Sequence, residues 1–145
     1  MAPDLYFAYG SNLSSARLLA RVPSARARGA ARLDGFALRL DKPGADGSGK
    51  ANLLATPGAL VWGVVYQLDP SDWPALDACE PGYERTAVRV ALDGAPLAAQ
   101  TYCSPLYGPG LAAFRWYHRH LVDGAREHGL PEEWIALIEA LPVRD

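Results

Sequence analysis

Apolar and aromatic residues open the chain in one continuous run. Residues 4–9 (Asp-Leu-Tyr-Phe-Ala-Tyr) predict a buried strand that enters a tight turn at residues 10–12 (Gly-Ser-Asn). Asn12 or Ser14 can then cap a helix, which Pro23 ends. The pattern therefore predicts a strand, a turn and the N-terminus of a helix.

The middle of the chain alternates apolar positions with polar or small ones. Residues 31–40 have the pattern of a half-buried strand, whereas residues 42–50 hold so many glycines that a flexible surface segment, able to serve as a lid, is expected. Two apolar runs follow at 51–56 and 60–68. The Pro57-Gly58 pair between them predicts a hairpin.

The remaining elements are a short helix, a second hairpin and a helical end. Residues 70–79 predict the short helix, capped by Ser71 or Asp72. Strands are expected from residue 83 to 92 and from there to about 103, joined by an Asp93-Gly94 turn, and helices over 111–128 and 131–140.

Strands that meet mostly through hairpins, followed by two helices, define the expected fold class. They predict an α+β domain whose sheet curls into a small mixed or antiparallel β-barrel with flanking helices. The doubly wound class has no support. Because repeats, low-complexity tracts and linkers are absent from the sequence, we expect one domain over residues 1–145.

The composition limits which binding partners and which cellular compartment are expected for this protein. The 145 residues are half apolar, which suffices for a core, and a net charge of -2 argues against nucleic acid as a partner. The sequence shows no signal peptide and no membrane span, so a cytoplasmic protein without a membrane partner is expected. Cys79 and Cys103 are expected to be reduced thiols, although one bridge remains open.

Two features carry candidate chemistry. At Tyr9-Gly10-Ser11-Asn12 a glycine lets backbone approach a ligand closely, although an ordinary strand-to-helix turn is the commoner interpretation. Glu80 stands at the end of a short helix, where catalytic side chains are often placed. By itself, a carboxylate in such a place is more often a solvated surface charge.

Other reactive residues give weaker signals. Cys79 could act as a nucleophile with a histidine as base, but His118 and His120 face different ways on a helix and His128 suits a helix C-terminus. No metal-ligand or nucleotide-binding motif occurs, so neither a metal nor a cofactor is expected. The early arginines could draw an anionic substrate, but a solvated face is the preferred interpretation; they stand at positions 17, 21, 26, 28, 32 and 39.

Taken together, four blocks resemble one family. Leu5 to Leu13 (LYFAYGSNL) resembles the opening signature of the γ-glutamylcyclotransferases and their AIG2-like relatives. Residues 49–66 resemble the family's central hairpin, Leu76 to Tyr83 its glutamate-containing stretch, and Gly124 to Pro131 the ending of its helical part. The blocks cover nearly the whole chain in the family's order.

The resemblance implies a mixed barrel with flanking helices, a site and a possible homodimer. Glu80 is expected to be the catalytic acid and base. The expected substrate-binding residues are Tyr6, Phe7, Ala8, Tyr9, Gly10, Ser11, Asn12 and Tyr117. The partner is a small γ-glutamyl substrate, whose own α-amine attacks its γ-carbonyl, closing 5-oxoproline and releasing an amine or amino acid without a cofactor.

That chemistry imposes a condition on Glu80. A carboxylate of pKa near 4.3 and an α-ammonium near 8 differ by roughly 5 kcal/mol, so an exposed glutamate would be a poor base. We therefore expect Glu80 to be sheltered, with a raised pKa. Whether the amides of Gly10 and Ser11 hold the α-carboxylate or the oxyanion stays open.

Three alternatives remain open at this point. The substrate could be a γ-glutamyl amine or a γ-glutamylated specialised metabolite instead of a γ-glutamyl amino acid. The chain could also be a non-catalytic small-molecule binding module on the same fold, since fold does not fix function. A third interpretation is hydrolysis that depends on Cys79, which thiol alkylation would block and cyclotransfer would survive.

Overall fold

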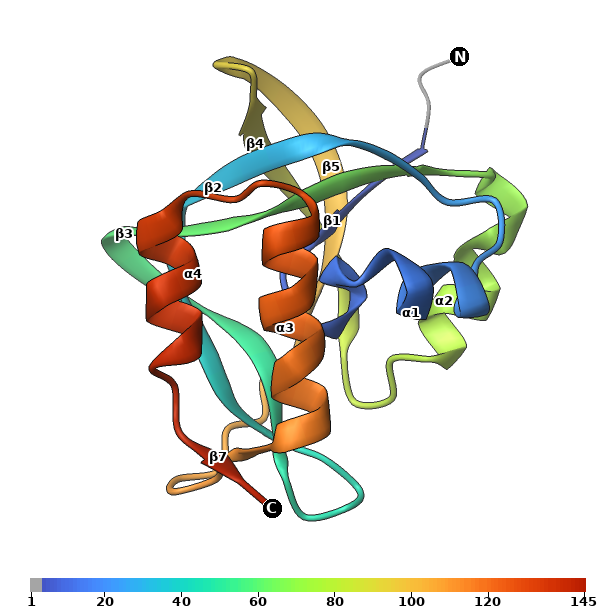
Figure 1. Ribbon diagram of the computed structural model, residues 1–145. Helices are drawn as coiled ribbons and strands as arrows, with labels where there is room; N and C mark the ends of the chain where they lie inside the picture. Colours follow the sequence, from blue (N-terminus) through green and yellow to red (C-terminus); the bar gives the residue numbers. More distant parts are fainter. Residues whose placement is uncertain (1–3) are drawn as a thin grey trace.

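Five strands close into a barrel in the order β1-β3-β2-β4-β5 (Figure 1). The computed structural model describes residues 4–145. The strands are β1 (Asp4–Ala8), β2 (Arg26–Pro43), β3 (Gly49–Leu68), β4 (Glu84–Leu92) and β5 (Ala95–Cys103). All neighbours are antiparallel except β1 and β5, which run parallel where Tyr6 lies opposite Gln100. The predicted mixed barrel is confirmed.

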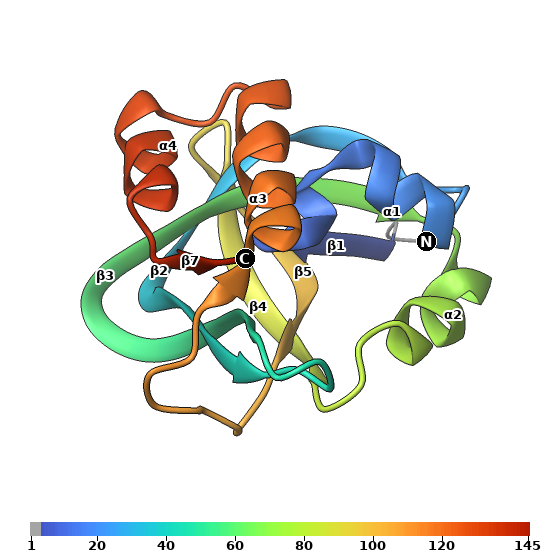
Figure 2. The same cartoon turned by 60° about the horizontal axis from the view of Figure 1, so that its bottom comes forward.

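Helices cover the outside of the barrel. They are α1 (Ser15–Arg21), α2 (Trp73–Ala78), α3 (Arg115–Glu127) and α4 (Glu132–Glu139), with 3-10 turns η1 (Ser11–Leu13) and η2 (Pro70–Asp72). In both views α3 and α4 lie side by side, and α1 and α2 lie on the far side of α3 from α4 (Figures 1 and 2). The flanking helices of the predicted α+β fold are therefore present.

The predicted strand, turn and helix at the beginning of the chain are confirmed. β1 is buried from Leu5 to Ala8, and η1 follows directly after Gly10. The hydroxyl of Ser14 accepts a hydrogen bond from the Arg17 amide at 3.4 Å, so this residue is the cap of α1. The helix ends at Arg21, ahead of the proline.

The hairpin predicted around Pro57-Gly58 is wrong. β3 runs without a break through this pair and bonds to β2, whose residues Asp34 and Phe36 lie opposite Leu60 and Ala55. The extra residues of β3 form a bulge, in which Gly58 has φ +84°. A bulge bends a strand without ending it, which is why the turn signal misled the sequence interpretation.

The glycine-rich segment at 42–50 is also more regular than expected. Its ends belong to the ladder, with Lys42 opposite Lys50, so that only residues 44–48 form a turn between β2 and β3. The Asp46 carboxylate accepts hydrogen bonds from the amide of Ser48 at 3.0 Å and from its hydroxyl at 2.6 Å. These contacts hold a hairpin turn in the place of the expected flexible segment.

The predicted helix over 111–128 begins later than expected, at Arg115. The residues before it enter a short parallel pair, formed by β6 (Ala113–Phe114) and β7 (Val143–Arg144). A pairing with residues 30 positions away leaves no local sequence signal.

The turn η1 is fixed directly against α3. A Cβ atom added to Gly124 would lie 2.3 Å from the carbonyl carbon of Leu13 and 2.5 Å from the amide nitrogen of Ser14. Only glycine permits this approach of helix and turn. The same face of α3 buries Tyr117, Leu121 and Ala125 at the predicted helical spacing, and together these contacts position the site described below.

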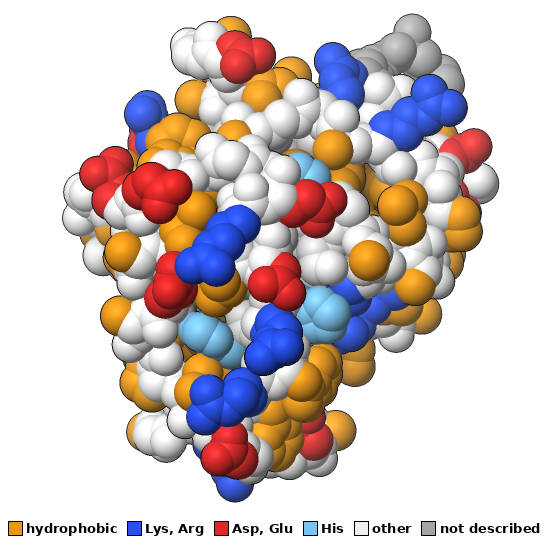
Figure 3. Space-filling model, in the orientation of Figure 1, with side chains coloured by type: hydrophobic (Ala, Val, Ile, Leu, Met, Phe, Trp, Pro, Cys, Tyr) orange, Lys and Arg blue, Asp and Glu red, His pale blue; other side chains and the backbone are white. Residues whose placement is uncertain are grey.

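Charges of both signs are mixed on the face formed largely by α3 and α4 (Figure 3). One example is the ion pair of 2.7 Å between Arg126 of α3 and Glu139 of α4. Within residues 4–145, no helix is long and apolar enough to cross a membrane.

Candidate active site

Two adjoining cavities lie where η1, α1 and α3 meet the turn after α2. The inner one has a volume of about 30 Å³ and is lined by Tyr6, Tyr9, Gly10, Ser11, Asn12, Ala51, Glu80, Tyr83, Tyr102 and Tyr117. The outer one has a volume of about 280 Å³ and shares Ser11, Glu80, Tyr83 and Tyr117 with the inner one. Seven of the nine residues predicted for the site thus lie around the inner cavity.

The two exceptions are Phe7 and Ala8. Both are fully buried in the core and neither lines a cavity. A Cβ atom added to Gly63 of β3 would lie 2.3 Å from the carbonyl oxygen of Ala8 and 2.7 Å from the ring of Phe7. The ring of Phe7 and the backbone of Ala8 therefore pack against β3, and the structure does not bring the two side chains to either cavity.

Glu80 lies on a tight turn that follows α2. Its amide donates to the carbonyl of Asp77 at 3.1 Å, and its carbonyl accepts from the amide of Tyr83 at 3.2 Å. Gly82, within this turn, has φ +82°, a conformation that favours glycine. The turn aims the carboxylate inward, so that 16% of the side chain remains exposed.

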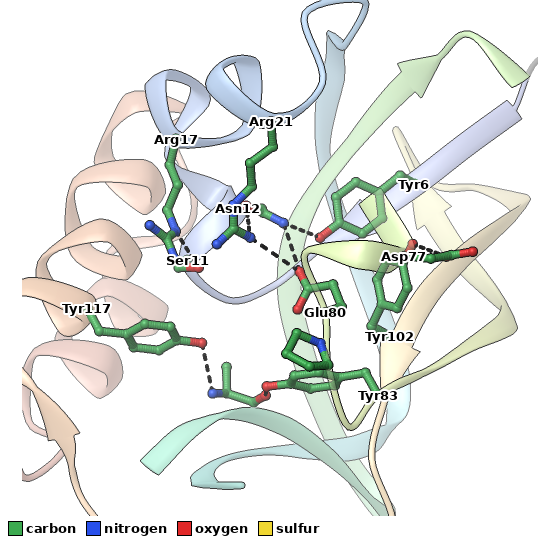
Figure 4. A network of polar contacts seen from close by, with 12 residues as sticks. Tyr6, Ser11, Asn12, Arg17, Arg21, Asp77, Glu80, Tyr83, Tyr102 and Tyr117 are labelled. Atoms are coloured by element: carbon green, nitrogen blue, oxygen red, sulfur yellow. Dashed lines mark hydrogen bonds and ion pairs between the residues drawn. The ribbon is translucent and has the colours of Figure 1, made fainter. Parts of the chain in front are cut away.

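An amide and a guanidinium, those of Asn12 and Arg21, meet the same oxygen of the Glu80 carboxylate (Figure 4). Its Oε1 accepts a hydrogen bond from Nδ2 of Asn12 at 3.2 Å and lies 3.6 Å from Nη1 of Arg21. Burial raises the pKa of Glu80 to about 7, against the opposing effects of Arg21, Arg17 and Asn12. The sheltered carboxylate with a raised pKa that the sequence led us to expect is therefore present.

Asn12 links the groups around this carboxylate. Its Nδ2 also donates to the hydroxyl of Tyr6 at 2.9 Å, while its Oδ1 accepts from Nη1 of Arg21 at 3.3 Å. Burial, followed by the charge of Glu80, raises the pKa of Tyr6 well above its usual range. The phenol of Tyr6 is therefore neutral and available as a hydrogen-bonding group beside Glu80.

The backbone of Ala51 forms the wall opposite Glu80. The β2–β3 register shifts between the Arg39 and Lys42 pairings, and bulges of this kind re-aim groups next to active sites. The Ala51 amide donates to the hydroxyl of Tyr117 at 2.9 Å, and its carbonyl accepts from the hydroxyl of Tyr83 at 2.5 Å. Two tyrosines are therefore fixed to the backbone of one residue at the edge of the cavity.

Gly10 and Tyr9 complete the inner cavity. A Cβ atom on Gly10 would lie 2.9 Å from the Cβ of Ala51, so glycine lets the turn approach β3. The hydroxyl of Tyr9 donates to the carbonyl of Tyr102 at 2.6 Å, and the hydroxyl of Tyr102 donates to Asp77 at 2.6 Å. The phenol of Tyr9 is thus committed to the barrel wall.

Sequence reasoning missed several residues of the site. Besides Ala51, Tyr83 and Tyr102, the missed residues are Arg17, Arg21, Lys42 and Lys50. The two arginines stand four residues apart on α1 and so share one face, which is a signal that the solvated-face interpretation overlooked. That interpretation holds for Arg26, Arg28 and Arg39, which lie exposed on β2, whereas Arg32 is half-buried.

Cys79 borders the outer cavity as a free thiol, and Cys103 is also free. The histidines make their contacts elsewhere, since His118 bonds the carbonyl of Ile138, His120 packs on Trp116, and His128 bonds Ser15 and Tyr66. Within residues 4–145, no group of three potential metal ligands comes together.

Known proteins share this sequence and fold. The sequence model of the AIG2-like family matches residues 60–138. Human γ-glutamylcyclotransferase is 33% identical over 153 aligned residues, covering 97% of this chain and 80% of the human protein. The bovine protein of the same name is 31% identical over 151 residues with the same coverage. A solved structure named γ-glutamyl cyclotransferase aligns with a TM-score of 0.91 at 32% identity, covering 99% of this chain and 90% of that one.

The closed barrel, the family match and the named relatives together identify the class of this protein as an AIG2-like enzyme. Since relatives more than 30% identical are aligned over four fifths of their own length, this chain belongs to the γ-glutamylcyclotransferase family.

Proposed function

We propose that the chain converts a γ-glutamyl amino acid or a γ-glutamyl amine to 5-oxoproline and the free amine, with Glu80 as general base and then general acid. The observation that carries the proposal is a largely sheltered carboxylate, 16% exposed, whose pKa is raised to about 7 and which lines a cavity beside the Gly10-Ser11 turn. A solvated surface glutamate would have neither property.

The raised pKa removes most of the proton-transfer penalty. An α-ammonium of pKa near 8 and a carboxylate of pKa about 7 differ by only about 1 kcal/mol. Glu80 takes one proton from the α-ammonium, and the neutral amine then attacks the γ-carbonyl carbon, so that a C–N bond closes the five-membered ring. Protonated Glu80 returns its proton to the leaving nitrogen as the original amide bond breaks, and the second proton of the ring nitrogen passes to the released amine, which departs as an ammonium.

The inner cavity suits the reacting end of the substrate. Its volume is enough for about two water-sized groups, such as an amine and a carbonyl. The Gly10 and Ser11 backbone is proposed to bind the α-carboxylate or the oxyanion, and the neutral phenol of Tyr6 can donate a hydrogen bond as charge develops. Tyr117, held by Ala51, is proposed to keep the γ-glutamyl chain folded for attack.

The test is the identity of the product. The wild-type protein is incubated with a panel of γ-glutamyl amino acids and γ-glutamyl amines, and both 5-oxoproline and the released amine are quantified. We expect the two products in equal amounts from at least one panel member. Formation of glutamate in place of 5-oxoproline would indicate hydrolysis, and the absence of any turnover would favour the binding module.

A second part of the same assay distinguishes hydrolysis that depends on the Cys79 thiol from cyclotransfer through Glu80. Cys79 lines the outer cavity, so a bulky alkylating group could obstruct it even if the thiol takes no part in the chemistry. The Cys79→Ser variant is therefore the cleaner probe. Cyclotransfer through Glu80 should leave the serine variant within a few-fold of the wild type, whereas a nucleophilic thiol would make it inactive.

A further inference from the structure

The outer cavity holds more positive than negative charge. Four cationic side chains line it, together with the carboxylates of Asp46 and Glu80. Arg21 lies 3.6 Å from Glu80 and Lys50 lies 3.2 Å from Asp46, so each carboxylate has a partner. Among residues 4–145, no carboxylate lies within 4.0 Å of the two remaining cations, Arg17 and Lys42.

Lys42 is the more unusual of these two cations because it is buried, with 6% of the residue exposed. Its Nζ donates to the carbonyl of Pro81 at 2.8 Å and lies 4.7 Å from the centre of the Tyr83 ring. An ammonium has three N–H donors, and burying one without a counter-anion is costly. The bond to Pro81 uses one of these donors, so the other two are available to an anionic ligand in the cavity.

Arg17 occupies a different part of the cavity. Its Nε donates to the hydroxyl of Ser11 at 3.0 Å, and its guanidinium lies 5.4 Å from the centre of the Trp116 ring. It thus stands at the turn proposed to hold the γ-glutamyl group, while Lys42 is bonded to the residue that follows Glu80. The two cations are attached to separate walls of the site (Figure 4 shows the Arg17 wall).

Building on the proposed function, we infer that Lys42 determines specificity by binding the carboxylate of the leaving amino acid. Arg17 then faces the α-carboxylate of the γ-glutamyl group. The two carboxylates of a γ-glutamyl amino acid offset the charges of Arg17 and Lys42, and the proton that passes from the α-ammonium to Glu80 leaves the net charge of the site unchanged. A γ-glutamyl amine has only one carboxylate and offers none to Lys42.

The test uses two substrates that differ only in the carboxylate of the leaving group, γ-glutamyl-alanine and γ-glutamyl-ethylamine. The wild type should prefer the first in kcat/KM by about 10- to 100-fold, the usual range for a hydrogen bond to a charged group. In Lys42→Met this ratio should fall to within a few-fold of one. Because the ratio compares two substrates on one enzyme at one pH, effects on Glu80 or on the folded fraction cancel.

Three further variants distinguish a local role from a general charge effect. Lys42→Arg, which keeps the charge, should retain most of the preference. Lys50→Met removes a cation that Asp46 already neutralises, and Arg89→Met removes an exposed charge on β4; both should change the ratio less than Lys42→Met does.

The inference is overturned if the wild type turns over both substrates equally or prefers the amine. It is also overturned if Lys42→Met keeps the wild-type ratio, or if Lys50→Met lowers the ratio more than Lys42→Met does. Each of these results would leave the proposed cyclotransfer reaction itself unchallenged. A wild type that releases no 5-oxoproline from any γ-glutamyl compound would instead overturn the proposed function together with this inference.

Discussion

At the scale of single residues, Glu80 combines two opposing effects. Burial raises its pKa, while Arg21, Arg17 and Asn12 act in the other direction, and burial is the larger effect. The outcome near 7 suits a group that must first accept a proton and then donate it. A site with less burial would give a weaker base, and one without the arginines would give a carboxyl that stays protonated at neutral pH.

Arg21 should therefore control the pH dependence of the reaction. Its charge is the largest influence that lowers the pKa of Glu80, so Arg21→Met should raise that pKa. Because the base must be ionised, the rising limb of kcat/KM, near pH 7 in the wild type, should move to higher pH. The substrate's own titration is common to both enzymes. As a control, Arg28 is exposed and bonded to Gln67, so Arg28→Met should leave the pH of the rising limb unchanged. A rising limb that shifts to lower pH in Arg21→Met would contradict this explanation.

The two tyrosines on Ala51 should contribute unequally to stability. Tyr117→Phe leaves the buried Ala51 amide without its acceptor and should cost about 1–3 kcal/mol. Tyr83→Phe removes a donor to the Ala51 carbonyl and should cost less, since carbonyls tolerate a missing partner better than amides do. Urea unfolding of the two variants tests the order, and equal losses would argue against it.

At the scale of elements, the contact between α3 and η1 fixes the turn that we propose binds the substrate. Gly124→Ala gains about 1 kcal/mol of helix propensity, but its methyl group would lie within 2.5 Å of backbone atoms of Leu13 and Ser14. Backbone cannot rotate away as a side chain can, so a net loss of about 2 kcal/mol is expected, together with reduced turnover as Asn12 moves from Glu80. Arg119→Ala, exposed on the same helix, is the control; a Gly124→Ala variant as stable as that control would be the contrary result.

Local sequence signals predicted the elements whose ends are set locally. Ser14 caps α1, and Asp93-Gly94 joins β4 to β5, with φ values of +52° and +77° in the turn. Pro57-Gly58 looks the same in sequence but lies within β3, because β2 is long enough to pair on both sides of the bulge. A turn signal cannot reveal the length of the partner strand.

The site, too, combines residues that the local sequence reveals with residues that only the fold brings to it. Most of its predicted residues come from two blocks recognised by resemblance, and the structure brings Glu80, Asn12 and Tyr117 together. Lys42 and Lys50 were missed because they stand in a glycine-rich stretch, and their place beside Glu80 depends on the β2–β3 turn. Phe7 and Ala8 belong to the matching signature yet face the core, since a shared motif does not tell a contact from a support.

At the scale of the whole molecule, the buried carboxylate should make stability depend on pH. The pKa of Glu80 rises from 4.5 to about 7 on folding, so the folded state binds more protons between these values and stability falls as pH rises through them. Between pH 5 and pH 8 the wild type should therefore lose roughly 2 kcal/mol more than Glu80→Gln does. Urea unfolding of both proteins at the two pH values measures the difference, and parallel pH profiles would mean that the carboxylate is not buried in solution.

The most direct test of the central claim is the rate of 5-oxoproline release from γ-glutamyl-alanine by the wild type and by Glu80→Gln at pH 8, with the fold of both checked by circular dichroism. Glutamine keeps the size of the side chain but cannot accept and return the proton. The account predicts a folded variant whose release is reduced at least about 100-fold, the lower end of what general acid–base catalysis contributes. A folded Glu80→Gln protein that releases 5-oxoproline at the wild-type rate would show that another group moves the proton.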